Sequence, residues 1–390
     1  MSQIALSINY TNKVYRIAVS TLFFLQGLCF ATWASRIPSI QQQLQLSESM
    51  LGVVLFAIPA GSLVSLLFSD GLVTRYGSKK IATNALLLYS LILPLIGLSN
   101  SLVLLILALV LFGMAGNIAN IAINTQAVLV EAKYEKNIMA SFHGLWSLAG
   151  FLAAGVGSFM IGRGIVPMMH FVLIATVLVI GVAISFHYLL PDGKKPAQAA
   201  KGFVKPDRFL LTLGVIAFCC MICEGAMFDW SGIYFQKVVG ADKEWIGAGY
   251  TAFMCAMATG RFVADWVSNR LGFRRTIVSS GLLIAAGLLL SVLAPFLATS
   301  ILAFMLVGIG VSAVIPLIYS EAGKSKGIAA GKALTAVSSI GFLGFLMGPP
   351  LIGLLAGAFN LRISFAFIAV MGILISLLTL RSRFFRTANA

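Results

Sequence analysis

Charged residues are scarce in this chain. Asp, Glu, Lys and Arg together make up 10% of its 390 residues, whereas hydrophobic residues make up 59% and the mean hydropathy is +1.00. A 41.5 kDa chain of this composition does not have enough polar side chains to cover a water-exposed surface, which excludes a soluble globular domain. The composition predicts an integral membrane protein.

Residue types that hold metals or perform catalysis are also few. The sequence has three His and five Cys, and Cys220 and Cys223 form one C-x-x-C pair beside Cys219, with no second pair and no nearby His. We therefore expect no metal site and no redox site. A Walker A sequence is absent, and no long polar segment offers a soluble catalytic domain. We expect no enzyme activity and no cofactor. Without ATP hydrolysis, any transport by this chain would draw on an ion or solute gradient, and a proton gradient is the energy source that we expect.

What the chain has in abundance is long apolar runs. A helix needs about 20 apolar residues to cross the hydrocarbon core. Twelve runs meet this length, six on either side of a polar segment. We predict an N-terminal six-helix bundle over 1–190, a basic cytoplasmic linker over 191–207 and a C-terminal six-helix bundle over 208–390. The runs lie at 16–40, 48–70, 81–99, 102–130, 138–162, 166–190, 208–236, 244–267, 276–298, 300–322, 328–357 and 361–380.

A short motif occurs twice, near the end of the second run and of the eighth. Asp70-x4-Arg75-x-Gly77 is followed by two Lys, and Asp265-x4-Arg270-x-Gly272 is followed by two Arg. The copies are offset by 265 − 70 = 195 residues, half the length of the chain. The motif therefore marks equivalent loops in two related halves, which is typical of a membrane carrier whose halves move against each other.

The basic residues favour one orientation. Most of the 27 Lys and Arg residues fall in the loops on the side of the N-terminus, and cytoplasmic loops retain positive charge. We predict a multi-pass protein of the bacterial inner membrane with both termini in the cytoplasm. The net charge of +15 is spread over short clusters at helix ends. It therefore indicates topology and contacts with the lipid bilayer, and not nucleic-acid binding.

The chain resembles the major facilitator superfamily over essentially its whole length. The resemblance lies in twelve spans in two halves and in a basic loop that follows the second span and recurs after the eighth. The family loop usually has Gly at its start and an acidic residue just before the first basic one. Here Asp70 and Asp265 stand at the start, and Thr74 and Asn269 stand before the basic residues. The resemblance implies a secondary transporter that works by alternating access.

Within the superfamily, several motifs resemble the YbjJ-type branch near the fucose permeases. They are Trp33-Ala-Ser-Arg36-Ile-Pro38, Asn124-Thr-Gln126-Ala-Val, Ser141-Phe-His143-Gly, and Glu224-Gly225-Ala226 with Asp229-Trp230. This resemblance implies a proton-coupled carrier and names no solute.

Two ionisable residues in apolar runs are candidates for proton coupling. An ionisable group at bilayer depth costs at least about 2.5 kcal/mol and persists mainly beside a cavity or a partner. Glu224 lies 16 residues after Arg208, or about 24 Å along a helix, and is suited to binding and releasing a proton. His143, near the start of the fifth run, is the second candidate. For each residue the alternative is a hydrogen bond that only fixes helix packing.

Polar residues in the fourth run predict a solute-binding face. Asn117, Asn120 and Asn124 recur at helical spacing, and Glu131 extends the stripe by seven residues. Amides both donate and accept hydrogen bonds, so they suit a hydroxyl-rich or amide-bearing solute. The alternative is that they join helices to one another.

Three further residues are candidates for solute contact. Gln26 and Trp33 lie seven residues apart and thus on one face of the first run, and Phe228 follows Glu224 by one turn. Anchoring at the lipid headgroups is an equally natural role for a Trp.

Charged residues near the helix ends are candidates for gates. Asp229 minus the repeat offset gives position 34, close to Arg36, so these two residues are expected to pair at the outer side when the carrier faces inward. Asp70 with Arg75, Asp265 with Arg270, and Glu131 are the candidates for the inner gate. The alternatives are residence at the headgroups for the first pair and solvated loop charges for the others.

Three function classes fit these features. The first is a proton-coupled symporter of a small polar solute such as a sugar or a peptidoglycan-type compound, and we expect it to work as a monomer. The second is a proton-antiporting exporter of amphipathic drugs, and the third is a receptor without transport. The polar stripe favours the first class. Exporters of the resembled family tend to carry a Gly-Pro signature in the fifth span, and no Pro lies in 138–162, so the sequence favours the exporter less.

Overall fold

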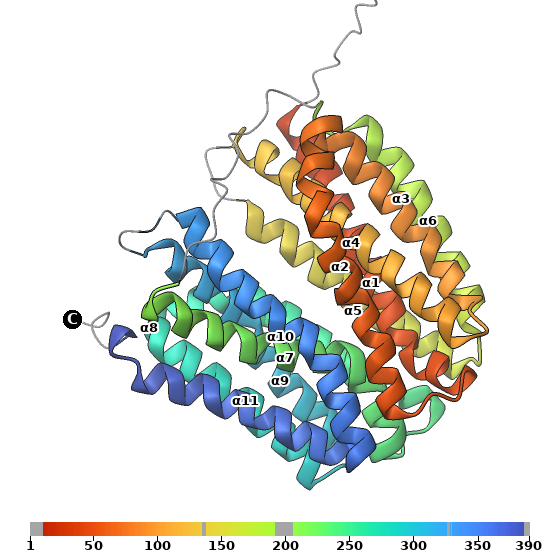
Figure 1. Cartoon of the computed structure of the whole chain (residues 1–390), viewed down its shortest axis with the longest axis vertical. Helices are drawn as coiled ribbons and strands as arrows, with labels where there is room; N and C mark the ends of the chain where they lie inside the picture. The colour runs from red at the N-terminus through yellow and green to blue at the C-terminus, as the bar shows by residue number, and fades with distance from the viewer. Residues whose placement is uncertain (1–10, 135–137, 192–205, 326–327, 329, 386–390) are drawn as a thin grey trace, which may run out of the picture.

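The computed structural model describes residues 11–134, 138–191, 206–325, 328 and 330–385, and the regular structure in these residues is entirely helical (Figure 1). This confirms the predicted fold class. The α-helices are α1 Asn12–Gln43, α2 Glu48–Tyr76, α3 Ser78–Gly97, α4 Leu102–Glu131, α5 Met139–Gly162, α6 Pro167–His187, α7 Arg208–Tyr234, α8 Ala248–Leu293, α9 Leu297–Gly323, α10 Ala330–Ala358 and α11 Leu361–Arg381. Three short turns complete the list: the π-helical η1 Phe235–Val239, and the 3-10 turns η2 Lys243–Trp245 and η3 Arg383–Phe385.

Eleven helices in the described residues are long and apolar enough to cross a membrane, whereas the sequence predicted twelve. The difference lies in α8, whose 46 residues bend at Gly272. Residues 248–271 and 273–293 of α8 correspond to the eighth and ninth apolar runs. Two helical segments that meet in a sharp kink at Gly272 therefore occupy the positions of the two predicted spans.

The duplicated motif adopts the same backbone conformation in both copies. Gly77, between α2 and α3, has φ 89° and ψ 149°, and Gly272, 195 residues later, has φ 77° and ψ 159°. A residue with a Cβ is strongly disfavoured at such angles, whereas Gly adopts them without steric cost. The glycines thus allow the chain to reverse sharply between two crossing segments, and the repeat in sequence is a repeat in structure.

Short polar side chains define where several helices begin. Ser47, Ser101, Asp207 and Asn360 each accept a hydrogen bond from the backbone N–H three residues later, at the starts of α2, α4, α7 and α11. These bonds satisfy donors that the first helical turn leaves free and contribute about 1 kcal/mol each.

The helices form two groups. Helices α1 to α6 pack mainly on one another, as do α7 to α11, and the groups meet where α1 contacts α7, α2 contacts α10 and α5 contacts α8. We call the groups the N-terminal half, residues 11–191, and the C-terminal half, residues 206–385. In Figure 1 the halves converge at one end and diverge toward the other, where α11 ends.

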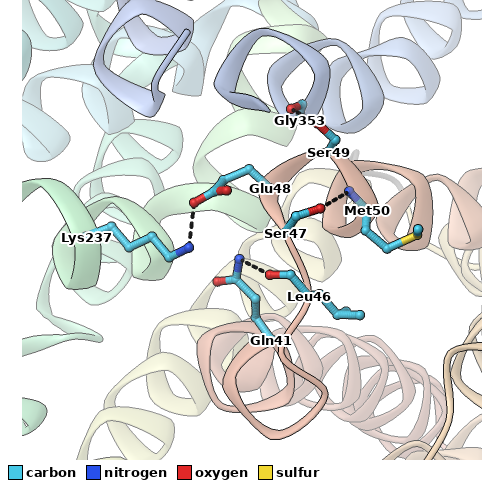
Figure 2. Close-up of polar contacts among 8 residues, drawn as sticks. All are labelled: Gln41, Leu46, Ser47, Glu48, Ser49, Met50, Lys237 and Gly353. Atoms are coloured by element: carbon cyan, nitrogen blue, oxygen red, sulfur yellow. Dashed lines mark hydrogen bonds and ion pairs between the residues drawn. The ribbon is translucent and has the colours of Figure 1, made fainter. Parts of the chain in front are cut away.

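We call the diverging end the basic face, because it holds the end of α11 and the bends at Gly77 and Gly272, each of which is followed by two basic residues. We call the converging end the opposite face. At the opposite face the halves touch through backbone. A Cβ built on Gly353 of α10 would lie 2.7 Å from the Cα of Gly52 of α2. Nearby, Lys237 Nζ lies 2.5 Å from Glu48 Oε1, and Ser49 Oγ donates to the Gly353 carbonyl at 3.4 Å (Figure 2). The halves are therefore closed against each other at the opposite face.

Candidate transport site

A cavity of about 320 Å³ lies between the two halves. Helices α1 to α5 supply most of its wall, and the C-terminal half supplies Glu224, Arg261 and Phe345. The wall residues Asn120 and His143 are exposed to solvent. Both stand toward the basic-face ends of their helices, so water reaches the cavity from the basic face.

The charged part of the wall is an ion pair within the C-terminal half. Arg261 Nη2 on α8 lies 3.1 Å from Glu224 Oε1 on α7, and the side chains are 22% and 8% exposed. Arg261 Nη1 also donates to Ser147 Oγ on α5 at 2.6 Å. Arg261 therefore joins the two halves at the depth of the cavity while it holds Glu224.

Arg261 is not among the site residues predicted from the sequence, in which most basic residues mark helix ends. It was nevertheless detectable, because it lies well inside the apolar run 244–267, and an intramembrane cation marks a functional site. That its partner is Glu224, 37 residues earlier, depends on how α7 and α8 pack, which the sequence does not show.

The amide stripe of α4 divides along its length. Asn117 and Asn120 line the cavity as expected, whereas Asn124 does not. Asn117 Nδ2 donates to Ser65 Oγ at 2.8 Å and to the Ser62 carbonyl at 3.3 Å, so it also joins α4 to α2. Asn124 Nδ2 donates to the side-chain oxygen of Asn120 at 3.0 Å.

Gln26 also lines the cavity, as expected. Its Nε2 donates to the Gly116 carbonyl at 3.2 Å, while its buried Oε1 has no hydrogen-bond partner among the described residues. Gln26 thus joins α1 to the polar wall formed by α4 and keeps a buried acceptor without a partner.

Glu131 does not continue the cavity stripe. Its Oε2 accepts hydrogen bonds from the backbone N–H groups of Ile138 and Met139, at 2.7 and 2.8 Å, and so caps the start of α5. A carboxylate in this position also interacts favourably with the positive end of the helix dipole. Seven-residue spacing placed Glu131 on the cavity face, but α4 ends at this residue and the side chain turns to the next helix.

Aromatic rings from both halves close the cavity toward the opposite face. Phe30 and Trp146 line it, and the ring of Phe228 packs edge-on against both, with centroids 5.4 and 6.4 Å apart. Phe228 also meets Tyr250 and Phe253 of α8, at 6.3 and 5.7 Å. Phe228 is itself buried behind the wall, so in this conformation it supports the residues that line the cavity and does not line it.

Trp33 does not reach the cavity, although the sequence placed it on the face of Gln26. It lies two turns farther toward the opposite face and is 1% exposed. His143 does line the cavity. Its ring packs edge-on against Phe23, 5.1 Å between centroids, and is exposed on the basic-face side.

The predicted pairing of Arg36 with Asp229 is wrong for this conformation. Arg36 donates to the Ile165 carbonyl, within the N-terminal half, and no ion pair joins it to Asp229 among the described residues. Asp229 is buried and lies near Tyr250. The sequence offset puts the two residues at equivalent heights but does not fix the directions of their side chains. The ion pair that joins the halves at this face is Glu48 with Lys237.

The candidates for the inner gate lie at the basic face. Asp70 and Arg75 are exposed, and Arg75 stacks over the ring of Tyr76. Arg270 stacks over Trp266, 4.4 Å from its centroid. Asp265 belongs to α8, but its side chain lies outside the described part of the structure. No described ion pair joins these groups across the halves, which agrees with halves that diverge here.

Two groups of membrane-spanning helices around a charged central cavity, closed at one face, define a membrane transporter. The chain belongs to the Major Facilitator Superfamily, whose family model matches residues 19–327 and 240–388.

Its relatives and its fold agree with this assignment. An uncharacterised transporter of the same superfamily from Yersinia pestis is 30% identical over 356 residues, covering 91% of this chain and 92% of the relative. The membrane protein MosC of Rhizobium meliloti is 31% identical over 376 residues, covering 94% and 90%. Among solved structures, a point mutant of the nucleoside transporter NupG superposes with a TM-score of 0.74 at 12% identity, covering 94% of this chain and 99% of the other.

Proposed function

We propose that this protein is a proton-coupled symporter that imports a small polar solute, a sugar or a sugar-derived compound of the peptidoglycan type, across the bacterial inner membrane. One observation carries the proposal: the amides of Asn117, Asn120 and Gln26 face the same cavity as the Glu224–Arg261 pair. Amides recognise hydroxyl and amide groups, and a buried carboxylate held by a cation that also contacts the other half can link its protonation to movement of the halves.

Further parts of the proposal concern setting and mechanism. The basic face is the cytoplasmic face, both termini lie there, and the carrier works as a monomer by alternating access. In this orientation the described conformation faces inward, with Glu48–Lys237 closing the outer side. Among the branches of the superfamily we propose the YbjJ-type branch, on the motifs around Trp33, Ser141 and Glu224.

The test is transport by the purified protein in liposomes that contain a pH dye. Neutral sugars, amino sugars, sugar acids, nucleosides and lipophilic cations are added one at a time outside. We expect a polar solute to drive protons inward in the wild type and not in Glu224→Gln. Glu321→Gln is the matched control, because Glu321 is a carboxylate at the far end of α9 paired with Lys324 and should behave as the wild type. Solute uptake without proton movement, equal in all three proteins, would contradict the proposal.

The aromatic side of the cavity supports a second candidate function. Phe23, Phe30, Trp146 and Phe345 line the same cavity as Glu224, and an acidic group among aromatic rings suits a lipophilic cation. In the same assay, proton movement that occurs only with lipophilic cations identifies the protein as an exporter.

A further inference from the structure

The cavity wall has no net charge from its acidic and basic residues. Among its described residues, Glu224 is the acidic residue and Arg261 is the basic one, and they form an ion pair. Cys220 and Tyr319 lie near Glu224, and His143 faces Arg261. If a proton neutralises Glu224, Arg261 keeps a positive charge without a counter-ion inside the membrane.

We propose that the solute is a small sugar acid and that its carboxylate replaces Glu224 as the partner of Arg261 when Glu224 takes up the co-transported proton. This inference rests on the proposed symport and specifies its substrate class. In the empty carrier, Glu224 and Arg261 cancel each other. In the loaded carrier, protonated Glu224 is neutral and Arg261 is balanced by the carboxylate of the solute.

The geometry of Arg261 suits this exchange. Its side chain is the more exposed member of the pair, 22% against 8%, so a solute reaches the guanidinium before it reaches Glu224. The guanidinium presents two terminal nitrogens, one now on Glu224 and one on Ser147. A planar fork of donors is the group best matched to a carboxylate, which it binds through two parallel hydrogen bonds.

The rest of the cavity suits a single sugar ring. Gln26 lines it, and its buried Oε1 has no partner among the described residues, so that a turn of the side chain would offer an acceptor to a hydroxyl or an amide N–H. Asn120 supplies a further exposed amide, and the aromatic side chains of Phe30 and Trp146 add apolar surface against which a sugar ring can pack. A volume of about 320 Å³ is at the small end of ligand cavities. These groups place the hydroxyls on the N-terminal half and the carboxylate on the C-terminal half.

Charge balance also explains why protons should not leak. Moving an unpaired charge through the closed intermediate of the cycle is costly in a low-dielectric interior. Glu224 protonated without solute leaves such a charge on Arg261, as does solute bound with Glu224 still ionised. Only the empty and the doubly loaded forms are neutral, so proton and anion must cross together and no net charge moves.

The experiment compares two pairs of solutes in which one member is an acid: glucuronate with glucose, and N-acetylmuramate with N-acetylglucosamine. Uptake of each solute into liposomes that contain the wild-type protein is measured under an inward proton gradient. Each measurement is made with and without an inside-negative potential of about 100 mV, which is set by potassium and valinomycin. We expect at least one acid to be taken up at least 10-fold faster than its neutral partner, and its rate to change less than about 2-fold with the potential. Symport of a neutral sugar with one proton would move a charge, which a 100 mV potential favours by up to about 50-fold.

Proton-coupled uptake of a neutral sugar that rises with the potential overturns the sugar-acid proposal and leaves the proposed symport intact. Uptake of neither acid also overturns it. Failure of every solute in the wider panel to move protons overturns the proposed function itself.

Three variants test the exchange at Arg261. Glu224→Gln keeps Arg261 free for the anion without a proton, so we expect it to exchange labelled for unlabelled acid across the membrane while losing accumulation driven by the proton gradient. Arg261→Gln is expected to lose both activities, and Arg261→Lys to recover part of the exchange. Equal exchange by Arg261→Gln and the wild type refutes the assignment of Arg261 as the anion site.

Discussion

The contact between Gly52 and Gly353 should control which face of the carrier is open. Opening the opposite face requires these backbones to separate, whereas the described conformation needs them together. In Gly353→Ala the new Cβ would lie 2.7 Å from the Cα of Gly52 and 2.8 Å from the Glu48 carbonyl oxygen. Both neighbours are backbone atoms, which a rotamer change cannot move aside, so the substitution penalises the described conformation and leaves the separated one unaffected.

The penalty is comparable to overpacking of a core by one methyl group, about 1–3 kcal/mol. A factor of ten in an equilibrium corresponds to about 1.4 kcal/mol, so the population should shift about 5- to 150-fold toward a form open at the opposite face.

Hydrogen–deuterium exchange measured by mass spectrometry reports this shift without added labels. We expect faster exchange in Gly353→Ala at the start of α2 and the end of α10, and slower exchange at the start of α5 and in the part of α8 next to its bend at Gly272. Gly348→Ala is the matched control on the same helix, because its new Cβ would meet nothing closer than 3.7 Å. If Gly353→Ala exchanges like Gly348→Ala at both faces, the backbone contact does not determine the conformation.

Three smaller effects follow from other contacts. Glu48→Gln removes a partly exposed ion pair with Lys237, whose interaction free energy is about 0.2–1 kcal/mol. Hydrogen–deuterium exchange at the opposite face should therefore rise by less than about 5-fold, and Lys237→Gln should give the same rise. Glu131→Ala removes the cap of α5 and should lower the stability measured by thermal unfolding by about 1–2 kcal/mol. The substrate concentration for half-maximal uptake should stay unchanged, and a change in that concentration would show that Glu131 acts in the transport site. Asn117→Ala loses the hydrogen bonds of Asn117 to α2 and should lower stability by about 1 kcal/mol. It should also weaken solute binding, and a loss of stability with unchanged solute binding would show that the amide has only a structural role.

Much of the fold was predictable because the signals are local. Apolar runs of sufficient length identify spans, and the copies of Asp-x4-Arg-x-Gly identify equivalent turns whose glycines take the same unusual backbone angles. Glu224 was also found locally, because a carboxylate inside an apolar run is conspicuous.

What the sequence did not reveal depends on how helices rotate against one another. Spacing places Gln26 and Trp33 on one face, but the cavity ends between them, so only Gln26 lines it. Symmetry places Arg36 near Asp229 along the helices, but Arg36 turns to the Ile165 carbonyl. The Glu224–Arg261 pair likewise depends on the packing of α7 against α8. Each case needs the orientation of a helix about its own axis, which depends on tertiary contacts.

The two halves share the repeated motif but differ at the cavity. Subtracting the 195-residue offset from Glu224 and Arg261 gives Cys29 and Leu66, and adding it to Asn117 and Asn120 gives Ser312 and Ile315. One half therefore has the charges and the other the amides, while both have the glycine bends. Because the charges come from one half and the amides from the other, neither half alone contains all the polar groups of the cavity.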